Sequence, residues 1–380
     1  MKPPPHLLQR LLGHTSFILE GLRLLLGHAL GQQCGLKLDR VEYQLLPWRF
    51  LQLAAKRCRA EYSAPSVFID APRRLGVRDH QHTHNQTPTT ETSMTGTGGE
   101  EALRQQYVLG EEIGRGRFGV VRRCYSAATG EALAVKSTPK APLRDKADPL
   151  DLALAEQEPK LHLLASSPPC SPHVVALHAA FEDAHAVHLV IDLCDGGDLF
   201  SLVSARGRLP EREAAGIAAQ IASALAACHR RGVAHRDVKP DNLLFDAATG
   251  ALRLGDFGSA EWFGDGRTMS GLVGTPYYVA PEVVAGREYG EKVDVWSAGV
   301  VLYLMLSGSV PFYGATAPEI FEAVLRGTLR FPPRAFASVS PEAKDLLRRM
   351  LCRDVSRRVS AEQVLRHPWI VSRGGNAVAD

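Results

Sequence analysis

The stretch VAHRDVKPDNLL, residues 233–244, concentrates side chains that can do chemistry. It contains Asp237, Lys239 and Asn242, and Asp256 follows downstream in LGDFGSA. Carboxylate and amide oxygens can bind a divalent cation, a carboxylate can accept a proton, and a lysine can neutralise an anion. Two interpretations are open at this point: a polar connector whose acids cap turns, or a set of catalytic groups.

A glycine-rich stretch and a lysine precede these residues. In IGRGRFGVV, the glycines Gly114, Gly116 and Gly119 lie between two strand-like runs. A hairpin there can close its backbone N–H groups over nucleotide phosphates, whereas a dinucleotide-binding turn would lead into a helix. Lys136 ends the strand-like LAVK, and alone it could simply keep a sheet edge soluble. The motifs that follow Lys136 favour a catalytic role for it, because HRDVKPDN, LGDFGSA and then APE at 280–282 follow in one order.

The elements that must position these residues form two groups. Short β-rich runs and one helical window, at 150–164, predict a small antiparallel sheet with one main helix. From Leu199 onward, apolar residues three and four apart predict a larger, mainly helical lobe. The fold class is therefore α+β with two lobes. The expected strands lie in 107–114, 119–130, 131–138, 174–183 and 186–194, and the expected later helices in 211–232, 291–308, 317–328, 340–352 and 360–370.

The ordered motifs resemble a eukaryotic protein kinase domain over residues 107–370. The resemblance implies a bilobal protein kinase fold with ATP and Mg²⁺ as cofactors. It assigns Lys136 to the α- and β-phosphates, Asp237 to the substrate hydroxyl and Lys239 to the neighbourhood of the γ-phosphate. It assigns Asn242 and Asp256 to magnesium. The further nucleotide-binding positions that it implies are Ile113, Gly114, Gly116, Gly119, Val121, Ala134, Asp192, Cys194 and Asp198.

The helical partner of Lys136 is an acid in LALAEQEPKLHLL, where Glu156 and Glu158 compete. Glu158 is the catalytic candidate, because it stands three residues before Leu161, the spacing at which members of the family place an apolar residue after this glutamate. Pro159 follows directly, and a proline inside a helix costs about 3 kcal/mol unless it lies in the first turn. The helix is therefore expected to begin or kink there.

Three later stretches narrow the resemblance. VGTPYYVAPEV, DVWSAGVVLYLMLSG and VSAEQVLRHPW resemble the calcium/calmodulin-dependent group of Ser/Thr kinases, in particular plant calcium-dependent protein kinases. The sequence holds no D-x-D-x-D-G loop with a terminal Glu, so neither calcium nor calmodulin is expected as a partner.

A more specific resemblance is to the phosphoenolpyruvate carboxylase kinases of plants, carried by GREYGEKVDVWSAGVVLY and CRDVSRRVSAEQVLRHPWI. It implies phosphorylation of a serine near the N-terminus of phosphoenolpyruvate carboxylase, which relieves malate inhibition, with the abundance of the kinase setting the flux. Another Ser/Thr kinase of the same group with a different substrate stays open. An inactive kinase-fold scaffold also stays open, although Lys136, Asp237, Asn242 and Asp256 are all present.

The segment before APE bears on control. Gly271 occupies the position where many kinases hold an activating phosphothreonine, and glycine cannot be phosphorylated. Arg236, which would clamp that phosphate, is present. Activity without phosphorylation is therefore expected, and the candidates to meet the arginine are a phosphorylated Ser270 or Thr268, or the carboxylate of Asp265.

Other charged residues have expected roles in specificity or support. Asp198 and Asp241 lie where basic-directed relatives carry acids facing the substrate, so Lys or Arg before the acceptor is expected; two solvated loop acids are the alternative. Asp198 also suits a ribose hydroxyl. Glu282 and Arg358 are expected to form a buried ion pair, and His235 to brace the catalytic loop by hydrogen bonding.

Composition bounds the remaining partners and the compartment. The chain has 380 residues, 45% hydrophobic and 22% charged, with a net charge of +3. Residues 1–93 hold 12 Lys/Arg and 7 Asp/Glu, and the rest holds 32 and 34, so no nucleic-acid partner is expected. No apolar run reaches the roughly 18 residues that span a membrane. Seven scattered cysteines without C-x-x-C pairs favour a reducing compartment, so we expect a cytoplasmic location, with nuclear access left open. We also expect a monomer.

The chain divides before the domain. Residues 79–99 are polar and rich in Thr and His, which is linker composition. Residues 1–93 are interpreted either as a disordered or untranslated gene-model extension, since Met94 could be the start, or as an amphipathic docking segment. We expect a linker at 94–106, the kinase domain at 107–370 and a short tail at 371–380.

Overall fold

The computed structural model describes residues 99–115, 119–140, 149–169 and 171–373. The chain divides into two units, and all of these residues belong to the second, Gln52–Asp380. The expectations for residues 1–93 therefore lie outside the described residues. Within the described part, every helix is too short or too polar to cross a membrane.

The first part of the domain is a five-stranded antiparallel sheet with the order β1-β2-β3-β5-β4. Consecutive hairpins bring β2 against β1 and β3, and the central β3 pairs with β5, so that Lys136 lies opposite both Val121 and Leu189. The strands are β1 (Tyr107–Arg115), β2 (Val120–Ser126), β3 (Ala132–Pro139), β4 (Leu177–Glu182) and β5 (Ala186–Asp192).

Helix α3 (Gly99–Gln106) lies within the stretch predicted to be a linker, and this part of the prediction is wrong. Leu103 is 1% exposed and packs with Cys124, Val135 and Val190 of the sheet. The helix start is held by Asp183, whose carboxylate accepts a hydrogen bond from the backbone N–H of Glu100 at 3.1 Å. One buried leucine and one cap therefore attach these eight residues to the domain.

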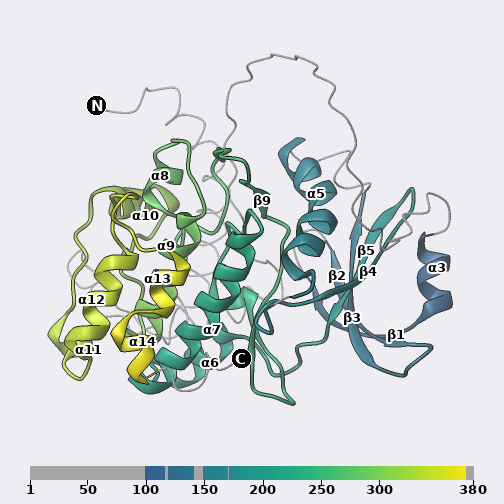
Figure 1. Ribbon diagram of the computed structural model, residues 1–380, viewed down its shortest axis with the longest axis horizontal. Coiled ribbons are helices and arrows are strands. Elements are labelled where there is room, and N and C mark those ends of the chain that lie inside the picture. The colour runs from purple at the N-terminus through teal and green to yellow at the C-terminus, as the bar shows by residue number, and fades with distance from the viewer. Residues whose placement is uncertain (1–98, 116–118, 141–148, 170, 374–380) are drawn as a thin grey trace, which may run out of the picture. The chain divides into compact units, whose positions relative to one another are not determined.

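Helix α5 (Pro149–Ser166) lies on the other face of the sheet (Figure 1). Val135 and Lys136 are neighbours on a strand and point to opposite faces: Val135 packs toward α3, whereas Lys136 reaches Glu158 on α5. The helix begins ten residues before Pro159 and continues through it, so the expectation that it begins at Pro159 is wrong. Figure 1 accordingly shows α3 and α5 on the two sides of the sheet.

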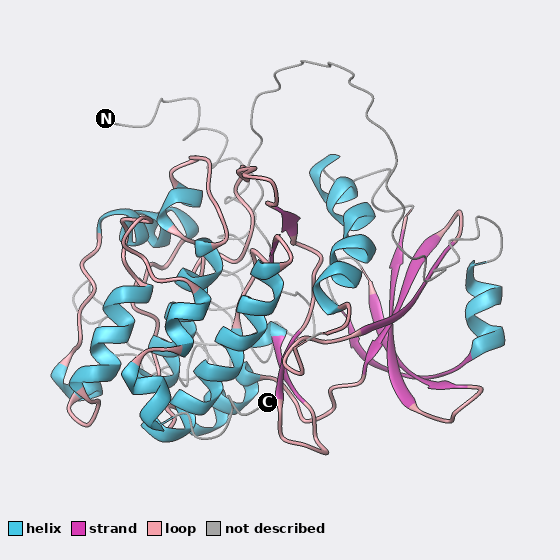
Figure 2. Ribbon diagram, in the orientation of Figure 1, coloured by secondary structure: helices cyan, strands magenta, loops and turns pink. Residues whose placement is uncertain are grey.

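The second part is mainly helical, as the apolar spacing predicted (Figure 2). Ser340 and Thr316 cap two of its helices with side-chain oxygens, and Ser360 forms a capping box with Gln363. Its elements are α6 (Leu199–Arg206), α7 (Glu211–Arg230), β6 (Val233–Ala234), the 3₁₀ turn η1 (Pro240–Asn242), β7 (Leu243–Phe245), β8 (Leu252–Leu254), β9 (Glu261–Trp262), α8 (Pro281–Val284), α9 (Lys292–Ser307), α10 (Ala317–Arg326), α11 (Pro333–Phe336), α12 (Pro341–Met350), α13 (Ala361–Leu365) and α14 (Pro368–Arg373).

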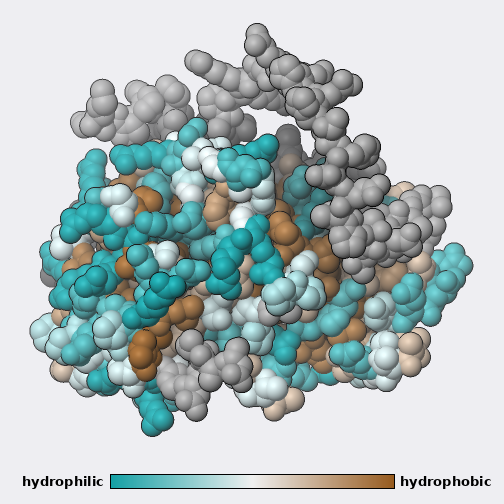
Figure 3. All heavy atoms as spheres, viewed as in Figure 1, coloured by the Kyte–Doolittle hydropathy of each residue, from teal (hydrophilic) through white to brown (hydrophobic). Residues whose placement is uncertain are grey.

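The core of this lobe is built around α9, which is buried on all sides from Val293 to Leu306. Arg358 lies over the ring of Trp296, with 5.1 Å from the guanidinium carbon to the ring centroid. It donates to Glu282 at 2.6 Å, so the expected buried ion pair is confirmed. Helix α14 continues to Arg373, three residues into the predicted tail. On the face drawn in Figure 3, polar side chains cover much of this lobe, and apolar ones occur in small separate areas.

Candidate active site

Lys136 joins residues that are far apart in the sequence. Its Nζ donates to Glu158 Oε1 on α5 at 2.6 Å and to Asp256 Oδ1 at 2.8 Å. Of the two acids that competed for this lysine, Glu156 is exposed and Glu158 is buried against it. The ammonium group therefore connects the sheet, α5 and the segment after β8.

The charges in this cluster shift one another's protonation. Burial lowers the pKa of Lys136, but the carboxylates of Asp256 and Glu158 outweigh it and raise the pKa overall. The lysine charge holds the pKa of Asp256 well below its usual range. Burial raises the pKa of Glu158, and Lys136 opposes that effect. Lys136 is therefore a permanent cation and Asp256 a permanent anion at neutral pH.

Asp237 lies in the connection between β6 and η1, and its two carboxylate oxygens have separate donors. Thr275 Oγ1 donates to Oδ1 at 2.7 Å, and Lys239 Nζ donates to Oδ2 at 2.6 Å. Lys239 also donates to Thr275 at 3.2 Å. Burial lowers the pKa of Lys239, but the charge of Asp237 outweighs it and raises the pKa. The carboxylate is thus held in one orientation beside a protonated lysine.

Asn242 and Asp256 carry the oxygens that could hold a metal ion. Asn242 Nδ2 donates to the Asp237 carbonyl at 2.9 Å, and Asn242 Oδ1 has no hydrogen-bond donor within the part of the chain that the structure describes. Asp256 Oδ1 meets Lys136, and Asp256 Oδ2 has no hydrogen-bond donor among the described residues. Amide and carboxylate oxygens fit a hard divalent cation such as Mg²⁺. The described residues contain no cluster of three or more His, Cys, Asp or Glu that would form another metal site.

A buried aspartate, Asp294 on α9, holds the backbone of the segment that contains Asp237. Its oxygens accept hydrogen bonds from the backbone N–H groups of His235 and Arg236, at 2.9 and 2.8 Å. Arg236 and Asp256 both have positive φ angles, 65° and 61°, which a non-glycine residue adopts only where its surroundings compel it. His235 Nε2 donates to the Gly255 carbonyl at 3.0 Å, so the predicted bracing role of this histidine is confirmed.

The residues predicted around the nucleotide lie mainly on the first three strands. Ala134 and Lys136 share one face of β3, and Gly114 pairs with Val121 across β1 and β2. At Gly119, a Cβ atom would collide with the Ser137 carbonyl, so the backbone needs a glycine there. Ile113 on β1 is 44% exposed. Gly116 lies outside the described residues.

The connection between the lobes carries the other predicted nucleotide positions. Asp192 ends β5, and its carboxylate accepts hydrogen bonds from His178 Nε2 at 2.8 Å and from Arg253. Cys194 is partly buried, and Asp198 caps α6 by accepting from the Ser201 N–H at 2.6 Å. The Asp192 carboxylate is therefore engaged in the protein, and so is its backbone N–H, which donates to the Ala176 carbonyl at 3.1 Å.

The acid that meets Arg236 is one that sequence reasoning missed. Arg236 donates to Glu261 on β9, to the Ser259 carbonyl at 2.7 Å and to Tyr289 Oη at 3.3 Å. The prediction of Asp265 in this role is wrong, because Glu261 makes the contact. No local sequence pattern singles out Glu261. It reaches Arg236 because β6 pairs antiparallel with β9, which places Glu261 opposite Ala234.

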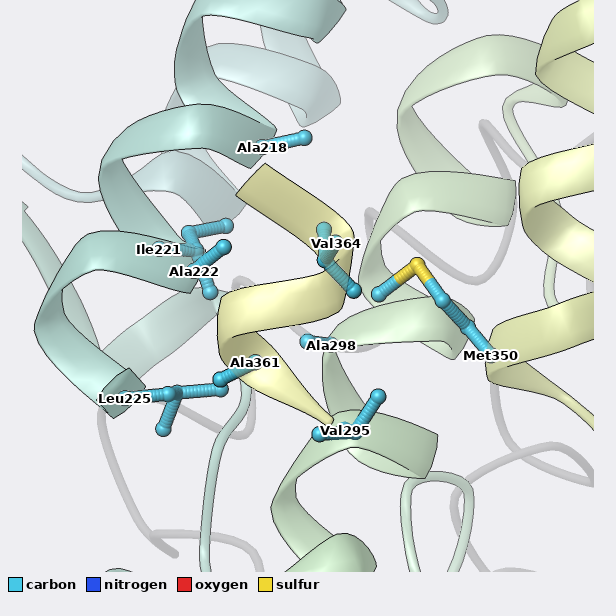
Figure 4. Close-up of a pocket in the computed structure, with 9 residues that line it drawn as sticks. All are labelled: Ala218, Ile221, Ala222, Leu225, Val295, Ala298, Met350, Ala361 and Val364. Atoms are coloured by element: carbon cyan, nitrogen blue, oxygen red, sulfur yellow. The ribbon is translucent and has the colours of Figure 1, made fainter. Parts of the chain in front are cut away.

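Two features of the domain lie outside this site. Cys124 is fully buried, and burial raises the pKa of its thiol to about 11, which opposes reactivity. A small apolar cavity lies among α7, α9, α12 and α13 (Figure 4), lined by Ile221, Val295 and Met350 among others. Its lining offers nothing to bind phosphate or metal.

Known proteins are similar to this chain over the residues that form the two lobes. A family model described as protein kinase domain matches residues 107–370. Calcium-dependent protein kinase 9 of Oryza sativa subsp. japonica is 46% identical over 270 residues, which cover 70% of this chain and 46% of that relative. Calcium-dependent protein kinase 25 of Arabidopsis thaliana is 43% identical over 274 residues, which cover 72% and 51%. The chain thus spans about half the length of these relatives.

The relatives overturn one expectation. The sequence was expected to have no calcium partner, because it contains no EF-hand loop. The proteins that it is similar to are named calcium-dependent protein kinases, which contradicts that expectation. The absence of one motif within 380 residues was too weak a basis for excluding a partner.

Proposed function

The chain belongs to the protein kinase family, and from that premise we propose that the residues around Asp237 transfer the γ-phosphate of ATP to a protein serine. The enzyme is a Ser/Thr protein kinase. The observation that carries the residue roles is the pair of connected clusters, Lys136 with Glu158 and Asp256, and Asp237 with Lys239 and Thr275.

In the proposed reaction, the carboxylate of Asp237 accepts the proton of the attacking hydroxyl. The hydroxyl oxygen forms a bond to the γ-phosphorus, the bond from that phosphorus to the β,γ-bridging oxygen breaks, and ADP leaves. Lys239 offsets negative charge on the transferred group, and Lys136 holds the α- and β-phosphates. Mg²⁺, bound through Asn242 and Asp256, would supply further positive charge beside the phosphates.

The proposed substrate is phosphoenolpyruvate carboxylase, phosphorylated at a serine near its N-terminus, in the cytoplasm. This substrate rests on the stretches 286–303 and 352–370, which resemble plant phosphoenolpyruvate carboxylase kinases. Asp198 and Asp241 support a preference for Lys or Arg before the acceptor. The relatives favour a second candidate, a kinase of the calcium-dependent group with another substrate. Because these relatives are named calcium-dependent protein kinases, we also propose that the activity of this chain responds to calcium.

The test is transfer of radiolabel from ATP by the full chain and by its Asp237→Asn variant. We expect labelling of intact phosphoenolpyruvate carboxylase, a fall of about 10²-fold or more in the variant, and no labelling of carboxylase that lacks its N-terminal serine. Each reaction is run with calcium and with a chelator, so that a calcium response is measured directly. Labelling of basic peptides without labelling of the carboxylase would refute the substrate and retain the kinase.

A further inference from the structure

The carboxylate of Asp192 connects the two lobes of the domain. Its Oδ1 accepts from His178 Nε2 on β4 at 2.8 Å, and its Oδ2 accepts from the backbone N–H of Ala176 at 2.9 Å. Oδ2 also accepts from the guanidinium of Arg253 on β8, and Arg253 donates in turn to Asp246 at 3.0 Å. A histidine from the sheet and an arginine from the helical lobe therefore share one carboxylate.

This network lies where the chain passes from the sheet to the helical lobe. Asp192 is the last residue of β5 and stands two positions before Cys194, in the segment that leads from the sheet to α6. Arg253 stands three positions before Asp256, which meets Lys136. The hydrogen bonds of one carboxylate thus fix the connecting segment against strands on both of its sides.

The side chains of the network are shielded enough for their charges to matter. The exposed fractions are 33% for His178, 15% for Asp192, 23% for Arg253 and 16% for Asp246. Arg253 Nε is buried and has no partner among the described residues, so the two carboxylates are what hold the guanidinium. Pairs with this degree of burial are screened less by salt than pairs on the open surface.

We propose that His178 and Arg253 are positioning residues for the nucleotide, which act through Asp192 to hold the segment 192–198 in the shape that binds adenine. The inference rests on the proposed function, because it takes that segment as the adenine site. Neither side chain touches the reacting atoms. Both act on the affinity for ATP rather than on the transfer step.

The network responds to pH through His178. The hydrogen bond to Asp192 raises the pKa of His178, burial lowers it, the charges of Asp192 and Glu131 raise it and that of Arg253 lowers it. The net shift is upward. A protonated His178 attracts Asp192, and this attraction is complete below the pKa of His178 and is lost as pH rises through it. The affinity for ATP should therefore fall across the same pH range.

The experiment compares the full chain with His178→Gln, in which the amide can still donate to Asp192 but cannot titrate. ATP affinity is measured by calorimetry, and KM for ATP and kcat by transfer to a basic peptide, from about pH 6 to about pH 9. We expect the wild-type KM to rise about threefold to tenfold with pH while kcat changes less, and the variant to show a flat KM. His185→Gln is the matched control, because that histidine is exposed and should leave the wild-type profile unchanged.

A second pair of variants tests the arginine. Arg253→Met should raise KM for ATP several-fold, and Arg253→Lys, which keeps the charge, should restore part of the affinity. A pH profile of His178→Gln equal to that of the wild type would overturn the inference, as would a loss of kcat at constant KM in Arg253→Met. A wild-type chain that binds ATP without transferring phosphate would instead refute the proposed function, and the calorimetric profile would still decide the role of the network.

Discussion

His162 makes the stability of the domain depend on pH. It lies one helical turn beyond Glu158 on α5, is 2% exposed, and its Nε2 donates to the Val175 carbonyl at 2.7 Å. Its ring stacks on Phe257 with 4.6 Å between centroids. Burial lowers the pKa of His162 to about 4. In the unfolded chain the same imidazole titrates near about 6.5.

The sign and size of the effect follow from these two pKa values. Between about pH 6.5 and about pH 4 the unfolded chain binds a proton at His162 that the folded chain does not, so stability falls as pH falls. At pH 5, this difference amounts to about 2 kcal/mol, whereas near pH 7.5 it is close to zero. His162→Gln keeps an N–H donor for Val175 and removes the titration.

Urea denaturation at about pH 7.5 and at about pH 5 measures the difference for both proteins. We expect the wild-type chain to lose about 2 kcal/mol more than His162→Gln over this interval. His185→Gln, an exposed histidine on the turn between β4 and β5, should lose as much as the wild type. Equal losses in the wild type and in His162→Gln would show that His162 is not held neutral by its contacts, and the reasoning would fail.

Two further predictions concern residues that the sequence did not reveal. Leu103→Ala should lower the free energy of unfolding by about 2–5 kcal/mol, because it leaves a cavity between α3 and the sheet. Val108→Ala, at a position that is 61% exposed, should change it by less than about 0.5 kcal/mol, and denaturation of both variants tests the contrast. Glu261→Gln should destabilise the segment around Arg236 by about 1.5 kcal/mol or more, which would be measured as faster proteolysis and a lower kcat. Because Glu261 already pairs with Arg236, phosphatase treatment of the wild type should leave kcat unchanged. Loss of activity after phosphatase treatment would contradict the role of Glu261.

The strands and long helices were predictable because their apolar residues recur with the period of the element. The contact between Lys136 and Asp256, 120 positions apart, could not be predicted from periodicity. The resemblance of the motifs assigned both residues to the nucleotide site, Lys136 to the phosphates and Asp256 to magnesium, but did not give their direct contact. Helix α3 was missed because it is short and polar except for a few residues, so composition alone classed it with the preceding linker. The contacts of Asp192 were missed because they depend on side chains from β4 and β8 that no local pattern connects.

The acids that pair with Lys136 and Arg236 show that residue spacing can identify a partner on a helix but not in an irregular segment. Glu156 and Glu158 are two positions apart on a helix, about 200° around its axis, so only one of them can face Lys136. A choice between them is therefore a choice of helix face, which apolar neighbours such as Leu161 can settle. Asp265 and Glu261 lie along a segment without a regular period, and the pairing of β6 with β9 decides which one reaches Arg236. An acid in such a segment can be assigned to a cation only when the strand register is known, because a shift of one residue moves its side chain to the opposite face.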